Sequence, residues 1–230
     1  MQDLPPLDAA ELARRLAPFS PIELSSTAIE GLLAHYEELR RWNRHLSLIG
    51  PREGPELFSR HYGESLAALP LLPEAGGTLL DLGSGAGFPG LVIAIARRDL
   101  HPVLVESRQR KWSFLMSVCR RAALPCTCLN VRVDRPLPGE LPSDIRVLTA
   151  RAVALEGDLL TALTSRLAPG ARVLVWAGKQ RPEAPAELRL VAERALAGGQ
   201  HRRILCWRYE PAPGSPTSRR QDPEEEREES

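Results

Sequence analysis

The sequence lacks any apolar run that approaches the roughly 20 residues of a membrane-spanning helix, although the chain is 230 residues long. Its first residues, MQDLP, have neither the basic segment nor the apolar segment of a secretory signal. We therefore expect a soluble, cytoplasmic protein with no membrane partner.

Cysteine is scarce, and its spacing does not indicate a metal site. The four cysteines show neither C-x-x-C spacing nor an accompanying histidine pair, so they predict neither zinc binding nor a disulfide framework. We expect all four to be reduced thiols in or near the core. They are Cys119, Cys126, Cys128 and Cys206.

The chain also has little net charge, because 30 lysines and arginines balance 29 aspartates and glutamates. The tail over residues 211–230 carries −3, so the rest of the chain carries +4. This is mild for a nucleic-acid binder, whose domains often have a pI above about 9. Basic pairs such as Arg40-Arg41 and Arg120-Arg121 are compatible with RNA contact and equally with solvated helix faces. The acidic tail lacks a core-forming pattern, and we expect it to be disordered.

Glycine, in contrast, is concentrated in one short segment, residues 81–90, which read DLGSGAGFPG. The segment follows the apolar run 78–80 and leads into an amphipathic one, which predicts a loop between a strand and a helix that begins near Phe88. Glycines permit positive φ and leave no Cβ in the way of a ligand, and the first turn of a helix has unpaired N–H groups. We expect this loop to hold a ligand against its backbone.

The glycine spacing fits two classes of nucleoside cofactor. Residues 85–90 satisfy the dinucleotide pattern G-x-G-x-x-G, and Glu106, at the end of the next predicted strand, suits a ribose-binding acid. However, Asp81 ends the first strand, and its carboxylate suits a ligand with a cationic amino-acid end. Together with the glycines that follow, it fits the pattern D-x-G-x-G-x-G. That pattern resembles motif I of class I methyltransferases, which bind S-adenosylmethionine. A nicotinamide dinucleotide is the alternative.

Helical patterns fill residues 1–72, which we expect to form a helical cap. From residue 78, strands and helices alternate, and this predicts an α/β domain over residues 73–210 with a parallel sheet covered on both faces. The tail over residues 211–230 is the third part. The expected cap helices include one of about twenty residues that ends near Gly50 and another over 56–69. The expected strands are 78–81, 102–106, 127–131, 146–150, 171–176 and 203–207, and the expected helices are 88–97, 108–122, 155–167 and 183–197.

Ligands of such sheets bind outside the carboxyl ends of the strands, so residues that follow strands are site candidates. After the third strand, Val133 offers a backbone N–H and apolar contact to a base, and Asp134 an acceptor for an adenine amino group. A turn aspartate is the alternative for Asp134. After the fourth strand, the guanidinium of Arg151 suits a guanine edge, a phosphate or a carboxylate, and a structural ion pair is the alternative.

Four segments together resemble one known family, the bacterial 16S rRNA guanine-N7 methyltransferases RsmG or GidB. They are residues 36–44, 60–66, 81–90 and 149–153, and the resemblance extends over roughly residues 20–208. It implies a class I, Rossmann-like methyltransferase fold, S-adenosylmethionine as cofactor, and small-subunit rRNA or the 30S particle as partner. We expect a monomer without a metal.

The resemblance implies cofactor-site roles for five residues, namely Gly83, Phe88, Val133, Asp134 and Arg151. The other candidates follow from the residues themselves. Arg151 is the candidate catalytic residue and also a cofactor ligand. The candidate cofactor-binding residues are Asp81, Gly83, Gly85, Gly87, Phe88, Glu106, Val133, Asp134 and Arg151.

Guanine N7 carries a lone pair and no proton, so its methylation needs no general base and rests on alignment and exclusion of water. No [DN]-P-P-[YF] loop follows the fourth strand, as methylation of an adenine amino group would require. Cytosine C5 methylation needs a cysteine nucleophile. Cys126 and Cys128 lie at the start of the third predicted strand, away from the carboxyl ends of the strands where ligands bind, so we expect them to belong to the core. A non-catalytic RNA- or nucleoside-binding protein on the same fold is the alternative function.

Overall fold

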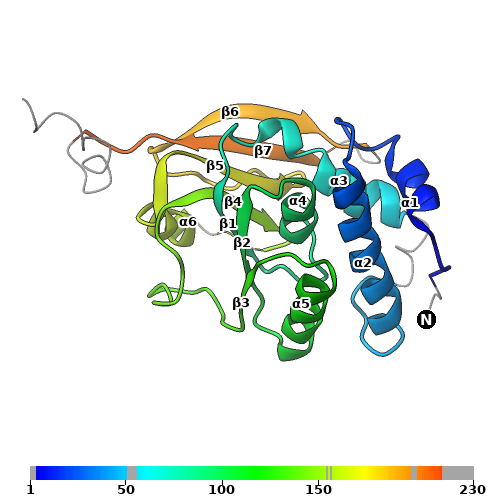
Figure 1. Ribbon diagram of the computed structural model, residues 1–230. Helices are drawn as coiled ribbons and strands as arrows, with labels where there is room; N and C mark the ends of the chain where they lie inside the picture. Colours follow the sequence, from blue (N-terminus) through cyan, green and yellow to red (C-terminus); the bar gives the residue numbers. More distant parts are fainter. Residues whose placement is uncertain (1–3, 51–55, 154, 156, 198–200, 214–230) are drawn as a thin grey trace, which may run out of the picture.

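A seven-stranded sheet forms the centre of the computed structural model, which describes residues 4–50, 56–153, 155, 157–197 and 201–213 (Figure 1). The strand order is β3-β2-β1-β4-β5-β7-β6. Strands β1 to β5 run parallel to their neighbours, and β7 and β6 add an antiparallel edge. The strands are β1 (Gly77–Leu82), β2 (Leu100–Val105), β3 (Thr127–Leu129), β4 (Ile145–Arg151), β5 (Leu167–Ala177), β6 (Leu188–Ala195) and β7 (Arg203–Tyr209).

Both faces of the sheet are covered. Successive residues of a strand point to opposite faces, and Leu79 and Leu80 of β1 are fully buried in two different apolar clusters. Figure 1 shows α4 (Gly90–Ala96) and α5 (Gln109–Arg121) on one face and α6 (Gly157–Thr164) on the other. An α/β architecture with helices on both faces is therefore confirmed, although the predicted sheet was parallel throughout and the structure has an antiparallel edge.

The N-terminal helices share a core with one face of the sheet. They are α1 (Ala9–Leu16), α2 (Ser26–Trp42), the π-helical turn η1 (Leu57–Gly63), α3 (Glu64–Leu66) and the 3₁₀ turn η2 (Leu69–Leu71). Leu12 of α1 and Leu32 of α2 are fully buried in the same cluster as Ile93 of α4. Burial of their apolar side chains holds these helices on the sheet.

Helix α2 ends eight residues before the predicted end. Asn43, at its C-terminus, accepts hydrogen bonds through Oδ1 from the backbone N–H groups of Leu48 and Ile49 at 2.9 and 3.2 Å. This side chain therefore closes a turn that replaces further helix. A second predicted boundary also moves, since α4 begins at Gly90 instead of Phe88.

The predicted helix over 183–197 is wrong, because residues 188–195 form strand β6. Its composition favours a helix, yet Leu188 pairs with Tyr209 and Ala195 with Arg203 in an antiparallel ladder. Pairing with β7 overrides a weak local propensity. The predicted helix over 155–167 is shorter than expected, since α6 ends at Thr164 and β5 begins at Leu167.

The prediction of four reduced thiols is wrong for two of them. Cys119 and Cys126 form a disulfide with their Cα atoms 6.4 Å apart, whereas Cys128 and Cys206 are free thiols. A turn after α5 returns the chain beside the helix, and sequence spacing alone does not show this approach. The acidic end of the tail, residues 214–230, lies outside the described residues. Across the part of the chain that is described, no helix is long and apolar enough to cross a bilayer.

Candidate functional site

The sheet reverses its order at β1, which lies between β2 and β4. Ligands of open α/β sheets bind at such a switch point, outside the carboxyl ends of the strands. A cavity of about 600 Å³ opens here, between the loop that follows β1 and the end of β4. Its lining includes the predicted residues Gly83, Gly85, Phe88, Glu106 and Arg151, together with His61, Glu64, Lys111, Trp176 and Arg202.

The backbone of the glycine loop explains the glycine spacing. Gly83, Gly85 and Gly87 have φ values of +67°, +54° and +85°, which only glycine adopts without strain. A Cβ on Gly83 would also lie 2.6 Å from Cγ2 of Val153. The loop thus presents bare backbone to the cavity, and any side chain at Gly83 would obstruct it.

Two buried polar side chains hold the loop from behind. The Nε2 of His35 lies 2.8 Å from the carbonyl oxygen of Ala86, and Nδ1 lies 2.6 Å from the hydroxyl of Tyr62. Asp81 is fully buried, and its Oδ1 accepts a hydrogen bond from the Thr149 hydroxyl at 2.6 Å. Neither Asp81 nor Gly87 lines the cavity. In this structure Asp81 supports the loop from behind, and the cofactor contact that the sequence led us to expect of it stays a prediction.

Burial acts on the two supports in opposite ways. It lowers the pKa of His35 from 6.5 to about 4 and raises the pKa of Asp81 from 3.8 to about 6. Between pH 6.5 and 4, the unfolded chain holds more protons at His35, so that residue costs stability as the pH falls. Between pH 6 and 3.8, the folded chain holds more protons at Asp81, so that residue adds stability as the pH falls.

We predict that Asp81→Asn makes the free energy of unfolding fall more steeply as the pH drops from 6 to 4. The substitution removes the contribution of Asp81, which adds stability as the pH falls, and leaves the contribution of His35, which costs stability as the pH falls. Each group changes the free energy of unfolding by at most about 1.4 kcal/mol per pH unit. Urea unfolding at several pH values measures the slope. Asp134→Asn is the matched control, since that carboxyl is exposed. Parallel pH profiles for Asp81→Asn and the parent protein would contradict the prediction.

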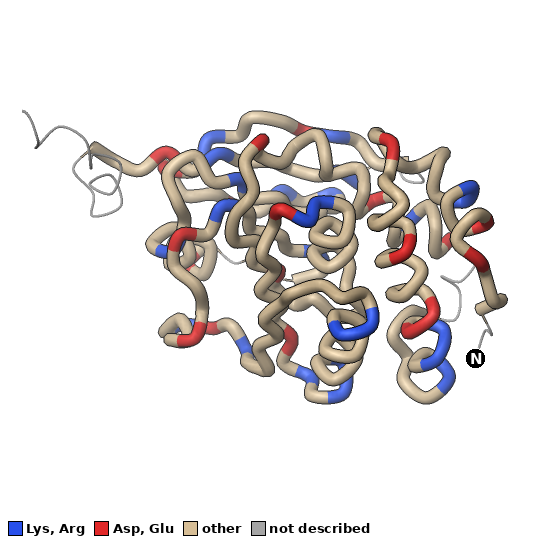
Figure 2. Tube along the Cα trace, in the orientation of Figure 1, with Lys and Arg blue, Asp and Glu red and all other residues tan. Residues whose placement is uncertain are grey.

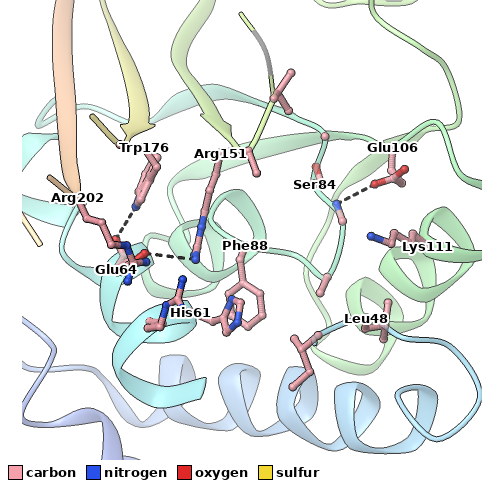
Figure 3. A pocket seen from close by; sticks show the side chains of 18 of the residues that line it. Leu48, His61, Glu64, Ser84, Phe88, Glu106, Lys111, Arg151, Trp176 and Arg202 are labelled. Carbon is pink, nitrogen blue, oxygen red and sulfur yellow. Dashed lines mark hydrogen bonds and ion pairs between the residues drawn. The ribbon is translucent and has the colours of Figure 1, made fainter. Parts of the chain in front are cut away.

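Glu106 forms the opposite wall of the cavity, one residue beyond the end of β2. Its Oε2 accepts a hydrogen bond from the N–H of Gly85 at 3.0 Å, and its Oε1 accepts one from the N–H of Arg108 at 2.8 Å. Figure 3 shows Glu106 and Lys111 on one side of the pocket, away from Arg151. The carboxylate thus lies at the strand tip, in contact with the glycine loop, where the sequence placed it.

A second cavity of about 250 Å³ lies beyond the loop and is lined by the remaining predicted residues, Val133 and Asp134. Gly83 and Val153 line both cavities, so the two spaces meet at this pair. The Asp134 carboxylate is paired with Arg132 at 2.6 Å and is largely exposed. Apolar side chains dominate the rest of the lining, and such a space suits a planar base.

Arg151 forms the ion pair that was the structural alternative for this residue, and it also lines the cavity, so its functional role stays a prediction. Its Nη2 lies 3.3 Å from Oε2 of Glu64, and the other carboxylate oxygen of Glu64 pairs with Arg202. Trp176 donates through Nε1 to the backbone oxygen of Glu64 at 3.1 Å. Figure 3 shows these side chains gathered on one wall. Burial raises the pKa of Glu64, and the two arginines oppose that rise.

Glu64, Trp176 and Arg202 were not among the residues predicted for the site. Glu64 lies within the segment 60–66 that carried part of the family resemblance, so a signal for it existed. Trp176 is the penultimate residue of β5, two residues before the first position that follows the strand. Arg202 lies between two strands of an unpredicted hairpin, and no local motif marks it.

The basic pairs in the helices are largely engaged in local contacts. Arg121 pairs with Glu37, and Arg41 pairs with Glu38 at 2.6 Å. Figure 2 shows basic positions at the end of α2 and at the ends of α5. Arg121–Glu37 and a hydrogen bond from Arg41 to Ser117 at 3.2 Å connect α2 with α5, as expected for solvated helix faces. Two other basic side chains, Arg108 and Lys111, line the cavity.

Comparison with known proteins relates the chain to methyltransferases. Residues 28–200 match the family described as GidB, rRNA small subunit methyltransferase G. The chain is 40% identical over 157 residues to the ribosomal RNA small subunit methyltransferase G of Paramagnetospirillum magneticum, across 68% of this chain and 74% of the relative. It is 36% identical over 192 residues to the protein of the same name from Desulfotalea psychrophila, across 82% and 85%.

Solved structures show the same fold at low sequence identity. A SAM-dependent methyltransferase from Aquifex aeolicus superimposes with a TM-score of 0.51 at 14% identity and covers 71% of this chain and 95% of its own. TrmN from Thermus thermophilus superimposes with a TM-score of 0.51 at 18% identity, across 64% and 48%. The predicted class I methyltransferase fold is thus confirmed.

Proposed function

We propose that the chain, which belongs to the GidB family of rRNA small subunit methyltransferases, transfers a methyl group from S-adenosylmethionine to N7 of a guanine in small-subunit rRNA. The observation that carries this proposal is the pair of cavities that meet at Gly83, at the switch point of the sheet. Together they offer a space for a nucleoside cofactor and a further space for a second molecule.

The residues present fit S-adenosylmethionine. The smaller cavity, lined by Val133 and Asp134, suits the adenine ring. Glu106 is the acceptor for ribose hydroxyls, and the bare backbone of residues 83–88 leaves room for the amino-acid end. When bound, the cofactor supplies an electrophilic methyl group. Asp81 and His35 keep the loop in the conformation that this binding requires.

The wall around Arg151 suits the target base. The guanidinium offers donors for guanine O6 or for a phosphate oxygen, and the salt bridge to Glu64 fixes its direction. Guanine N7 needs no base to remove a proton, so this chain's residues have only to align the nucleotide and exclude water. The ion pair with Glu64 and the position of Arg151 at the cavity support this role for its side chain.

The finer features of the function are proposals as well. We infer that the substrate is the rRNA within a 30S particle, that the protein acts as a monomer in the cytoplasm, and that the helical region 1–72 forms a cap on the methyltransferase domain 73–210. The family match and the cationic side chains Arg108 and Lys111 at the cavity support an RNA partner.

Transfer of a labelled methyl group to small subunits that lack this modification tests the proposal. We expect label in the small-subunit rRNA and none in fully methylated subunits. Cofactor binding without transfer would instead indicate a non-catalytic RNA-binding protein on this fold. Binding of a nicotinamide dinucleotide, measured by titration, would restore the alternative cofactor.

We predict that Glu106→Gln weakens S-adenosylmethionine binding by about 10- to 100-fold. The amide keeps the shape of the side chain but loses the charged acceptor, and hydrogen bonds to charged groups contribute about 1.5–3 kcal/mol. Isothermal titration calorimetry measures the affinity, with the exposed Glu140→Gln as control. Equal affinities for Glu106→Gln and the parent protein would remove Glu106 from the cofactor site.

A further inference from the structure

Three cysteine side chains converge where α5 meets the edge strand β3. The Sγ atoms of Cys119, Cys126 and Cys128 lie within 4.8 Å of one another. Cys119 and Cys126 are joined as a disulfide, and Cys128 Sγ lies 3.8 Å from Cys126 Sγ. None of the three lines either of the two cavities. The cluster is therefore separate from the site described above and does not depend on the proposed function.

The backbone around the cluster is held by several contacts. The N–H of Leu124 donates to the carbonyl oxygen of Cys119 at 3.0 Å, which closes the turn after α5. The Arg98 guanidinium donates to the carbonyl oxygens of Ala122 and Ala123, at 3.1 Å each. The indole of Trp112 donates to the carbonyl oxygen of Cys128 at 3.0 Å. None of these bonds involves the disulfide, so they hold the backbone around the cluster in addition to it.

We propose that Cys119, Cys126 and Cys128 form a binding site for one thiophilic divalent cation of the Zn²⁺ type when the Cys119–Cys126 disulfide is reduced. Zn–S bonds are about 2.3 Å long, so two thiolates on one tetrahedral ion lie roughly 3.8 Å apart. The Cys126–Cys128 separation already has this value. Soft thiolate ligands select such ions over Mg²⁺ or Ca²⁺.

Water is the fourth ligand of the cation in this site. No histidine or carboxylate belongs to the cluster among the residues that the structure describes. Cys128 lies on the edge strand β3 and Cys126 directly precedes that strand; both are half-buried, whereas Cys119 is buried. An ion therefore has a route from solvent past β3, and three protein ligands with one water complete a tetrahedron.

The chemistry of loading balances with a dithiol as the reductant. The dithiol gives two electrons and two protons to the Cys119–Cys126 bond, which yields two thiols, and is itself oxidised to a disulfide. Binding of the cation then releases the thiol protons of all three cysteines, because the thiolate is the ligand. Oxidation removes two of the three ligands, so the site exists in only one redox state.

Titration of the full-length protein with Cd²⁺, used as a spectroscopic probe for Zn²⁺, tests the site. After reduction by a dithiol and its anaerobic removal, we expect an ultraviolet thiolate-to-metal absorbance that saturates at one equivalent and is lost on competition with Zn²⁺. The oxidised protein should show no such absorbance. Cys119→Ser, Cys126→Ser and Cys128→Ser should each weaken binding at least 100-fold, whereas Cys206→Ala should bind as the parent does.

A second readout on the parent protein covers the case in which a serine variant does not fold. Alkylation followed by mass spectrometry should show that Zn²⁺ protects all three cysteines of the cluster. Absence of saturation at one equivalent would overturn the proposal, as would protection of fewer than three of these thiols. An equal loss of affinity in Cys206→Ala would also overturn it.

Discussion

Gly83→Asp is expected to abolish S-adenosylmethionine binding while the protein still folds. Gly83 has a φ of +67°, and a Cβ there would lie 2.6 Å from Val153, at the point where the two cavities meet. Any side chain would therefore strain the loop and narrow the passage that the cofactor has to occupy. A carboxylate adds bulk within the same space. Calorimetry should show affinity reduced by more than about 100-fold, a loss of at least roughly 2.7 kcal/mol.

Gly139→Asp is the matched control for this prediction. Gly139 is an exposed loop glycine, and a Cβ there would meet nothing within 4 Å. We expect it to bind the cofactor as the parent does, and Gly83→Ala to fall between the two. If folded Gly83→Asp protein bound S-adenosylmethionine with parental affinity, the cofactor would have to lie elsewhere than along residues 83–88.

Arg151→Met is expected to lower the rate of methyl transfer at saturating cofactor by at least about 100-fold. The substitution removes the guanidinium that faces the cavity and leaves its apolar stem in place. Misalignment of two reacting groups by an ångström can cost two orders of magnitude. Cofactor affinity should change far less than the rate, and single-turnover kinetics with small subunits measures both effects.

A double variant separates alignment from structural support. Arg151→Met alone removes one of the two arginines that form ion pairs with the buried Glu64 carboxylate, and loss of one partner of a buried pair typically costs roughly 3–5 kcal/mol. Arg151→Met with Glu64→Gln also removes the carboxylate that has lost a partner, so part of the lost stability should recover while the rate stays low. Recovery of the rate in the double variant would reduce Arg151 to a structural residue.

The sequence predicted the parts of the site that local chemistry dictates. The glycine loop needs positive φ at three positions, and this requirement appears directly in the residues 83–87. Glu106 and Arg151 follow apolar runs long enough to identify as strands, so their places at strand tips were predictable. Val133 and Asp134 followed from the same rule.

The rest of the site depends on contacts between segments that are distant in the sequence, and no local sequence pattern marks such contacts. Glu64 and Arg202 meet only because a hairpin at the sheet edge brings the segment before β7 against α3. The Cys119–Cys126 pair likewise depends on a turn after α5 that the spacing of seven residues does not reveal. Asp81 differs from these residues, because the glycine motif marked it from the sequence. Its burial behind the loop, however, became visible only in the structure.

The most direct test of the account is chemical mapping of N7-methylguanosine in small-subunit rRNA. Subunits that lack the modification are incubated with the protein and S-adenosylmethionine, and the RNA is then cleaved chemically at N7-methylated guanines and mapped by primer extension. We predict one new cleavage site, at a single guanine, that is absent without cofactor and appears far more slowly with Arg151→Met. Methyl transfer to another atom or base, or no new cleavage with the parent protein, would contradict the account.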